Sequence, residues 1–211
     1  MVQRPTVLVV DDDDSVRESL ESLIRAMGLG VETFSSAQEF LSSPLVEMAN
    51  CLVLDLRMPG LNGLELQQKL SDLKIEIPIV FITGHGDVPS SVRAMKAGAV
   101  EFLTKPFTDL DLCEAIRESI HRDEATRQQR AELCELQRRY GSLTTREREV
   151  MELVVRGLLN KQVASSLGVR QVTVKVHRAQ VMQKMQASSL ADLVRMSVKL
   201  KDSQSRPYTK V

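Results

Sequence analysis

Residues 7–16 read VLVVDDDDSV, in which four apolar residues run directly into four aspartates. A short apolar run rich in β-branched residues is typical of a strand that is buried on both faces. Carboxylates that crowd at the end of such a strand repel one another and take up protons, unless a cation or a basic side chain lies among them. The stretch therefore predicts a strand of a buried sheet with an ionic site at its end.

Four more apolar runs follow in the N-terminal half, and a segment with helical periodicity comes after each of the five. The predicted strands are VLVV (7–10), GVETF (30–34), CLVL (51–54), IPIVFI (77–82) and VEFL (100–103). Strands that alternate with helices form a parallel sheet with helices on both faces. This half therefore predicts the α/β class, with a five-stranded, doubly wound parallel sheet whose ligand site lies at the carboxyl ends of the strands.

Polar residues stand at four of these strand ends. Asp11 and Asp12 follow the first strand, Asp55 follows the third, Thr83 the fourth and Lys105 the fifth. Because the carboxyl ends of parallel strands meet at one edge of the sheet, these side chains should converge. Oxygen ligands of this kind suit Mg²⁺, and a carboxylate beside such a cation can attack a phosphoryl group to form an acyl phosphate.

Three longer motifs surround these residues, namely DLRMPGLNG (55–63), TGHGDVP (83–89) and AMKAGAVEFLTKPF (94–107). With the strand-end residues they resemble the receiver domain of two-component response regulators, closest to the FixJ subclass. The resemblance implies a flavodoxin-like receiver fold in which Asp55 is the phospho-acceptor and a sensor histidine kinase is the donor. It also implies Mg²⁺ as the cofactor, with four ligands: Asp11, Asp12, Asp55 and the backbone carbonyl of Arg57.

The same resemblance implies three further roles. Lys105 would pair with the phosphoryl oxygens, Thr83 would hydrogen-bond the phosphoryl group, and Phe102 would change rotamer with it. Such a switch would repack the surface of the fourth helix, fifth strand and fifth helix, and dimerisation through that surface would follow. The polar residues 13–15 lie beyond the metal pair, and one of them is expected to cap the first helix.

An enzymatic alternative starts from the same aspartates. DDDDS spells D-x-D-x-S with Asp11, Asp13 and Ser15, which resembles the first motif of haloacid-dehalogenase-type phosphatases, with Asp11 as the nucleophile. Thr83 and Lys105 could supply the second and third motifs of that family. This alternative leaves the aspartate of the third strand and the basic half of the chain without a role. We therefore expect no enzyme, apart from a receiver that catalyses its own phosphorylation and dephosphorylation with Mg²⁺.

The net charge of zero hides a division of charge along the chain. Residues 1–121 hold 19 acidic and 10 basic side chains, whereas residues 122–211 hold 9 acidic and 18 basic ones. Such asymmetry predicts two domains, the second with an anionic polymer as its partner. The expected parts are a receiver (1–121), a helical linker (122–141), a small all-α domain (142–200) and a disordered tail (201–211).

The segment that joins the two halves, residues 121–141, is rich in charge and in good helix formers, with no proline and no glycine before Gly141. It predicts a helix that extends the helix before it, rather than a flexible tether. Leu133, Leu136 and Tyr140 recur at helical spacing. Packing of this helix in a dimer is therefore an open alternative to a merely solvated helix.

The basic half, residues 142–200, predicts four helices. Thr144 can cap the first of them, with Glu147 reaching back as the second partner of a capping box. Asn160 can cap the second helix, and Gly168 can end it with a positive φ. A helix, a tight turn and a longer helix form the helix-turn-helix layout, in which the longer helix enters the major groove of DNA.

The longer helix, residues 171–186, is predicted to have two faces. One packs against the domain and holds Val174, Val181 and Met185, with His177 at its border. The other is exposed and holds Lys175, Val176, Ala179 and Gln183. Residues 170–184 contain four cations, Arg170, Lys175, Arg178 and Lys184, and no acidic side chain. The exposed face is therefore expected to bind a nucleic acid, because cations that neutralise phosphates release counterions.

Three motifs of this half, LTTREREV (143–150), NKQVASSLGV (160–169) and TVKVHR (173–178), resemble the DNA-binding domain of the LuxR, FixJ and NarL type. The resemblance implies base contacts from Lys175, Val176 and Ala179. It implies phosphate contacts from Arg170, Thr173, Arg178 and Lys161. His177 is expected to be a satisfied interface histidine rather than a base reader. An output domain that binds protein or RNA is the alternative, against which stand the absence of Trp and the 3% of aromatic residues.

Together these features predict a transcription factor controlled by phosphorylation. The expected partners are a sensor histidine kinase, double-stranded promoter DNA, a second copy of the chain after phosphorylation, and RNA polymerase as a further candidate. The chain has no signal-peptide pattern and no apolar run of about 18 residues, which predicts a cytoplasmic protein without a membrane partner. Its three cysteines match no metal or redox spacing and are expected to be reduced thiols.

Overall fold

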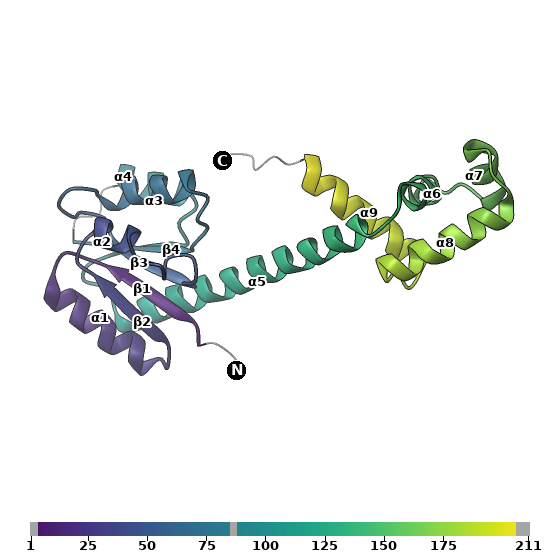
Figure 1. Cartoon of the computed structure of the whole chain (residues 1–211). Coiled ribbons are helices and arrows are strands. Elements are labelled where there is room, and N and C mark those ends of the chain that lie inside the picture. The colour runs from purple at the N-terminus through teal and green to yellow at the C-terminus, as the bar shows by residue number, and fades with distance from the viewer. Residues whose placement is uncertain (1–3, 85–87, 206–211) are drawn as a thin grey trace. The chain divides into compact units, whose positions relative to one another are not determined.

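The computed structural model describes residues 4–84 and 88–205, which form two compact units (Figure 1). The first unit ends at Arg127 and the second begins at Gln128. The strands of the first unit are β1 Thr6–Val10, β2 Gly30–Phe34, β3 Cys51–Asp55, β4 Ile79–Thr83 and β5 Glu101–Thr104. Its helices are α1 Asp14–Ala26, α2 Ala37–Leu41, α3 Gly63–Asp72, α4 Val88–Lys96 and the first part of α5 Asp109–Gly141.

The five strands are all parallel and lie in the order β2-β1-β3-β4-β5. This arrangement confirms the predicted doubly wound sheet. The limits of β2 are those predicted, and the limits of the other strands differ by one or two residues. β4 begins at Ile79 rather than at residue 77, because Pro78 has no N–H to donate to a neighbouring strand. β3 ends on Asp55 and β4 ends on Thr83, so both of these polar side chains stand at the carboxyl edge.

Two hydrophobic cores cover the two faces of the sheet, because successive side chains of a strand point to opposite faces. Leu8 of β1 belongs to the core under α2, α3 and α4, which also buries Phe40 and Leu66. Val9 belongs to the core under α1 and α5, which also buries Ile24. Figure 1 shows α3 and α4 on one side of the sheet and α1 and α5 on the other. Packing on both faces holds the strand ends in place.

Helix α5 stays in contact with the first unit beyond the predicted boundary at residue 121. Asp123 is 3% exposed and accepts hydrogen bonds from Asn50 Nδ2 at 2.7 Å and Arg127 Nε at 2.6 Å. Arg127 Nη2 also donates to the carbonyl of Ala49 at 2.8 Å. We call Asn50, Asp123 and Arg127 the Asp123 cluster. It fastens α5 to the residues just before β3, so the first six residues of the predicted linker belong to the first unit.

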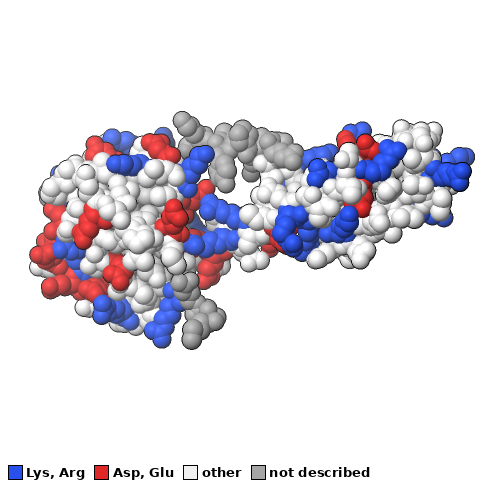
Figure 2. All heavy atoms as spheres, viewed as in Figure 1, with Lys and Arg blue, Asp and Glu red and all other residues white. Residues whose placement is uncertain are grey.

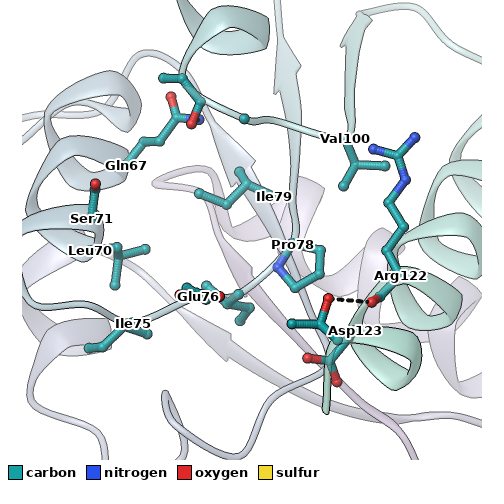
Figure 3. Close-up of a pocket in the computed structure, with 14 residues that line it drawn as sticks. Gln67, Leu70, Ser71, Ile75, Glu76, Pro78, Ile79, Val100, Arg122 and Asp123 are labelled. Atoms are coloured by element: carbon teal, nitrogen blue, oxygen red, sulfur yellow. Dashed lines mark hydrogen bonds between the residues drawn. The ribbon is translucent and has the colours of Figure 1, made fainter. Parts of the chain in front are cut away.

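A pocket of about 280 Å³ lies next to this cluster (Figure 3). Its lining includes Pro78 and Ile79 at the start of β4, Val100 just before β5, and Arg122 and Asp123 of α5. All of these residues lie at the amino ends of the strands or at the part of α5 beside them. The pocket is therefore separate from the polar residues at the carboxyl edge of the sheet.

The second unit contains the last part of α5 together with α6 Thr145–Val155, α7 Asn160–Leu167, α8 Gln171–Met185 and α9 Leu190–Ser205. Leu136 of α5 is buried in its core, and Tyr140 packs against the same core. Residues 122–141, the predicted linker, all lie within α5, so this segment is helical as predicted. Two of the three residues that could have packed in a dimer, Leu136 and Tyr140, already pack inside this unit. This packing argues against a dimer interface along α5.

Helix α9 extends to Ser205, so the first five residues of the predicted disordered tail are helical. Leu200 is buried, and Lys199 Nζ pairs with Glu132 of α5 at 2.8 Å. These contacts hold the last turns of α9 against its own unit, which explains why the helix continues. The rest of the predicted tail, residues 206–211, lies outside the described residues. Within the described part of the chain, no helix has both the length and the apolar character needed to cross a membrane.

Candidate functional site

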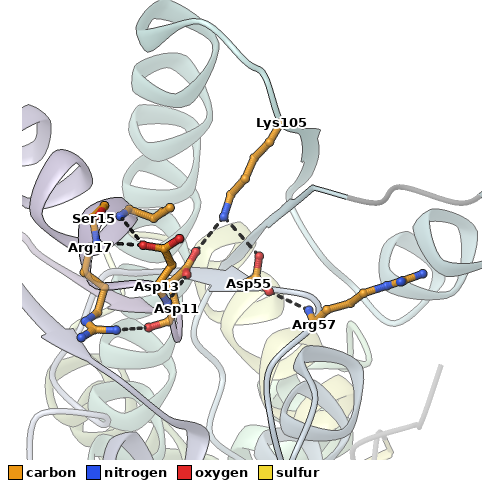
Figure 4. A network of polar contacts seen from close by, with 8 residues as sticks. Asp11, Asp13, Ser15, Arg17, Asp55, Arg57 and Lys105 are labelled. Carbon is orange, nitrogen blue, oxygen red and sulfur yellow. Dashed lines mark hydrogen bonds and ion pairs between the residues drawn. The ribbon is translucent and has the colours of Figure 1, made fainter.

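The carboxyl edge of the sheet brings together three of the predicted residues, Asp11, Asp55 and Lys105 (Figure 4). Lys105 Nζ donates to Asp11 Oδ2 at 2.8 Å and to Asp55 Oδ1 at 3.3 Å. Both carboxylates are buried, with exposed fractions of 1% for Asp11 and 6% for Asp55. An ammonium therefore bridges two buried carboxylates whose residues are 44 positions apart in the sequence.

Asp55 is held in one orientation by the loop that follows β3. The backbone N–H of Arg57 donates to Asp55 Oδ2 at 2.7 Å. The side chain of Arg57 is exposed and points away from the carboxylates (Figure 4). Burial raises the pKa of Asp55, and the Arg57 N–H and Lys105 offset this effect only in part. The hydrogen bond and the nearby ammonium therefore offset only part of the cost of burying the charged form of Asp55.

Asp11 is anchored more completely than Asp55. Its Oδ1 accepts from the backbone N–H of Asp13 at 2.9 Å, and its carbonyl accepts from Arg17 Nη1 at 2.6 Å. Burial of Lys105 would lower the pKa of its ammonium, but the nearby carboxylates of Asp11 and Asp55 outweigh burial and raise it. Lys105 is therefore firmly protonated at neutral pH. The anchoring role of Arg17 was not predicted, because nothing in its sequence position links it to the carbonyl of Asp11.

Thr83 and Phe102 lie on the neighbouring strands β4 and β5. Thr83 is 1% exposed, and its carbonyl accepts from the backbone N–H of Lys105 at 2.7 Å. Phe102 is half-buried and lies opposite Phe81 in the register of β4 and β5, with 6.1 Å between the ring centroids. The predicted hydroxyl residue thus lies on β4 next to the backbone of Lys105, and the predicted aromatic residue lies on the adjacent strand β5.

The other aspartates of the opening stretch lie further out. Asp13 caps α1 by accepting from the backbone N–H groups of Ser15 at 2.8 Å and Val16 at 3.4 Å, as predicted for one of residues 13–15. Asp12 is exposed. Among the described residues, no three His, Cys, Asp or Glu side chains are grouped in a way that could hold a metal ion. In this arrangement Lys105 is the cation that lies between the two buried carboxylates.

Gly63, the first residue of α3, was missed as a site residue. A Cβ atom at this position would lie 2.5 Å from the carbonyl oxygen of Asp55 and 3.0 Å from the ring of Phe81. The N–H of Gly63 donates to the carbonyl of Leu56 at 3.0 Å. In the sequence this glycine is only the end of a turn-like PGLNG segment. The close approach to the backbone of Asp55 depends on how α3 packs, which local sequence does not reveal.

In the second unit, α8 has the two predicted faces. Val174, Val181 and Met185 are buried, whereas Lys175, Val176, Ala179 and Gln183 are exposed, as predicted. Arg170 and Lys161 are also exposed, and Thr173 and Arg178 are half-buried. Of the residues expected to contact DNA, Lys175, Val176 and Ala179 therefore lie on the exposed face of α8. In the view of Figure 2, this unit shows many more Lys and Arg than Asp and Glu side chains.

Three details of this unit differ from the sequence predictions, and the first concerns Asn160. The N-cap position of α7 is Leu159, whose N–H donates to Gln162 Oε1 at 2.8 Å. Asn160 is the first helical residue, and its Oδ1 accepts from Arg178 Nη1 at 3.0 Å. With Asn160 as the N-cap, α7 would begin at residue 161, but it begins at Asn160 itself. Asn160 therefore orients an arginine that was expected to contact phosphate.

The second correction concerns Lys184, which does not belong to the exposed basic face. Its Nζ lies 2.7 Å from Glu147 Oε2 and 2.9 Å from Oε1, and Glu147 is 2% exposed. Glu147 also forms the predicted capping box with Thr144. Burial alone would raise the pKa of Glu147, but the hydrogen bonds of Lys184 and Thr144 outweigh it and lower the pKa. Lys184 is thus a structural partner of a buried carboxylate.

The third correction concerns His177. It is half-buried at the border of the packing face, as predicted, but its buried Nδ1 has no hydrogen-bond partner among the described residues. The expectation of a satisfied interface histidine is therefore wrong. An unpaired ring nitrogen costs free energy when it is buried.

Comparison with known proteins identifies the class. A family model described as the response regulator receiver domain matches residues 7–117. A second model, described as bacterial regulatory proteins of the luxR family, matches residues 141–197. The chain therefore belongs to the response regulators that join a receiver domain to a LuxR-type helix-turn-helix DNA-binding domain. This membership rejects the phosphatase alternative, and Asp13, which that alternative placed in a catalytic motif, is a helix cap.

Individual relatives are similar over nearly the whole chain. Nodulation protein W of Bradyrhizobium diazoefficiens is 52% identical over 191 residues, which are 90% of this chain and 84% of that protein. Response regulator protein TodT of Pseudomonas putida is 48% identical over 204 residues, which are 96% of this chain and 90% of that protein. These similarities confirm the predicted family of transcription regulators.

Two solved structures extend the comparison to the fold. The response regulator StyR matches with a TM-score of 0.86 and 52% identity, over 93% of this chain and 100% of that one. Full-length FixJ from B. japonicum matches with a TM-score of 0.57 and 41% identity, over 95% of this chain and 99% of that one. The predicted similarity to the FixJ subclass is thus confirmed by sequence and by structure.

Proposed function

We propose that Asp55 accepts a phosphoryl group from a sensor histidine kinase and that this modification controls DNA binding by α8. The observation that carries the proposal is the geometry of Asp55, a buried carboxylate at the end of β3 with one oxygen bonded to the Arg57 N–H and the other near Lys105. A carboxylate in one fixed orientation is suited to in-line attack, because its lone pairs are already aimed.

The transfer itself requires no further protein nucleophile. An oxygen of Asp55 forms a bond to phosphorus as the phosphorus–nitrogen bond to the kinase histidine breaks, and the imidazole keeps the electron pair. Lys105 is held near Asp55 as a protonated ammonium, so it can neutralise the incoming phosphoryl oxygens. The receiver would also react with small phosphodonors, because nucleophile and cation both come from this chain.

Mg²⁺ fits the charge of this edge. Two buried carboxylates face one ammonium, and burial raises the pKa of Asp55 although the Arg57 N–H and Lys105 oppose the shift. The groups here that could bind a metal are carboxylate and carbonyl oxygens, which are the ligands that Mg²⁺ prefers. Asp11 and Asp55, with the backbone carbonyl of Arg57, would hold the ion, and Asp12, which is exposed in this arrangement, would have to turn toward them to join the set. When bound, the ion would neutralise charge on the transferring phosphoryl group.

The signal would then pass from Asp55 to the surface of the receiver. Thr83 would donate its hydroxyl to the phosphoryl group, and Phe102, half-buried beside Phe81, would turn inward. Dimerisation through α4, β5 and α5 is supported by an exposed apolar row on α4, formed by Val88 at 75%, Val92 at 44% and Met95 at 44% exposure. Burial of such a row between two copies would be favourable.

A dimer would bring two α8 helices to the two half-sites of a promoter. Half-sites of helix-turn-helix dimers lie about 34 Å apart, and linkage of two modest affinities strengthens binding. The exposed cations Arg170 and Lys175 on and before α8 support binding to the DNA backbone and bases. A dimer seated on a promoter would also be placed to contact RNA polymerase.

The acceptor can be tested by labelling the full-length protein with a small phosphodonor and Mg²⁺, followed by mapping of the modified residue. We expect label on Asp55, no label in Asp55→Asn, and loss of label when a chelator removes Mg²⁺. Asp72→Asn is a matched control, because Asp72 is an exposed carboxylate of the same domain. Label that persists in Asp55→Asn would refute the proposal.

A further inference from the structure

Helix α8 exposes two valines on its solvent-facing side. Val172 is 63% exposed and Val176 is 53% exposed, and Ala179 is exposed in the same row. At about 100° per residue, the three side chains lie within about 60° of one another. The buried residues Val174 and Val181 lie on the opposite side of the helix. The exposed face is therefore apolar along its centre from Val172 to Ala179, and the polar Gln183 follows in the same direction one turn further on.

The surroundings of this row indicate an anionic partner. Residues 170–184 contain no acidic side chain, and Arg170 and Lys175 are exposed at the start of the row and beside it. A hydrophobic protein or membrane surface would not require these cations. The arrangement suits a partner that places negative charges opposite Arg170 and Lys175 and apolar groups opposite the exposed valines. Duplex DNA fits this description, since the C5-methyl of thymine is the apolar group that base edges display in the major groove.

We propose that Val172 is an additional specificity-determining residue, and that Val172, Val176 and Ala179 form one row that contacts thymine methyl groups. This inference rests on the proposed binding of DNA by α8 and goes beyond the contacts expected from the family, which did not include Val172. Val172 and Val176 are separated by about 6 Å along the helix axis. That distance corresponds to roughly two base-pair steps of about 3.4 Å. The preferred half-site should therefore contain thymines at two positions about two steps apart.

The test removes single methyl groups from the DNA. Duplexes are first selected from a random pool with the phosphodonor-treated full-length protein, and each thymine of a selected duplex is then replaced in turn by deoxyuridine. Loss of one buried methyl should weaken binding about fourfold, from about 0.8 kcal/mol for a group of this size. We expect such a penalty at two or more thymines with the wild-type protein.

Variants assign each penalty to a side chain. In Val172→Ala the penalty at one thymine should vanish while the penalty at another persists, and Val176→Ala should show the converse. Val198→Ala is the matched control, because Val198 is a valine of α9 with 53% exposure and should keep every penalty. Val172→Thr keeps the branched shape and one methyl, so it should bind more tightly than Val172→Ala.

Two results would overturn the inference, and they are distinguishable. If Val172→Ala keeps every wild-type penalty and the wild-type affinity, Val172 does not read thymine, although DNA binding by α8 still stands. If the treated wild-type protein enriches no duplex at all, the proposed function fails as well. In either case thermal unfolding of the variants at the wild-type temperature would show that the fold is intact.

Discussion

Replacement of Lys184 by methionine tests whether this cation supports the fold or contacts DNA. Lys184 Nζ lies within 2.9 Å of both oxygens of Glu147, which is 2% exposed. Removal of one partner of a buried ion pair costs about 3 to 5 kcal/mol, because a buried charge is left uncompensated. Lys184 is itself 36% exposed, so water can reach the vacated position. We therefore expect a loss of about 2 to 3 kcal/mol.

The assay combines urea unfolding of the full-length protein with the salt dependence of DNA binding. Lys184→Met should lower the urea midpoint of the second unit and leave the salt slope of DNA binding at the wild-type value. Lys161→Met is the matched control, because Lys161 is exposed and was predicted to contact phosphate. It should change stability by less than about 0.5 kcal/mol and reduce the slope by about 0.9.

The same pair predicts a dependence on pH. The pKa of Glu147 is lowered in the folded protein relative to the ordinary value of 4.5. The stabilisation is therefore complete above the unfolded pKa and is lost as the pH falls through the lowered folded value. The difference in stability between wild type and Lys184→Met should shrink below about pH 4. Equal stability of the two proteins at neutral pH, together with a reduced salt slope for Lys184→Met, would refute the structural role of Lys184.

Three further changes test other parts of the structure. Gly63→Ala should destabilise the receiver by about 1 to 3 kcal/mol and slow phosphodonor labelling of Asp55, because the new methyl meets the Asp55 backbone at 2.5 Å; an unchanged urea midpoint and labelling rate would contradict this. Asp123→Ala should lower the free energy of unfolding, measured in urea, by about 2 to 3 kcal/mol, because Asn50 Nδ2 and Arg127 Nε lose the carboxylate that accepts their hydrogen bonds. Burial raises the pKa of Cys51 to about 12, so a thiol reagent at pH 8 should modify only the other two cysteines until the protein unfolds.

The sheet and its polar edge were predictable because both depend on short-range patterns. Each strand is an apolar run, and the carboxyl ends of parallel strands share one edge, so Asp11, Asp55 and Lys105 could be brought together without coordinates. The contacts that were missed depend on tertiary packing. Neither the approach of Gly63 to the Asp55 backbone nor the capture of Lys184 by Glu147 can be inferred from spacing, since each joins elements whose packing is not encoded locally.

The same limit explains the errors at the ends of elements. Asn160 has the composition of a helix cap, but α7 begins one residue earlier and the side chain instead meets Arg178. The predicted tail contains polar residues, yet Leu200 and the pair formed by Lys199 hold α9 in place as far as Ser205. Local propensity ranks candidate positions, and packing against the rest of the unit decides among them.

The Asp123 cluster bears on how such a protein can be recombined with other signalling modules. A chimera joined at residue 121 would replace Asp123 and Arg127 with foreign residues. Asn50 and the carbonyl of Ala49 would then lose their hydrogen-bond partners. A crossover placed after Arg127 would transfer the receiver with those partners intact. The end of the cluster at Arg127 is thus the position at which this receiver domain is best joined to a different output domain.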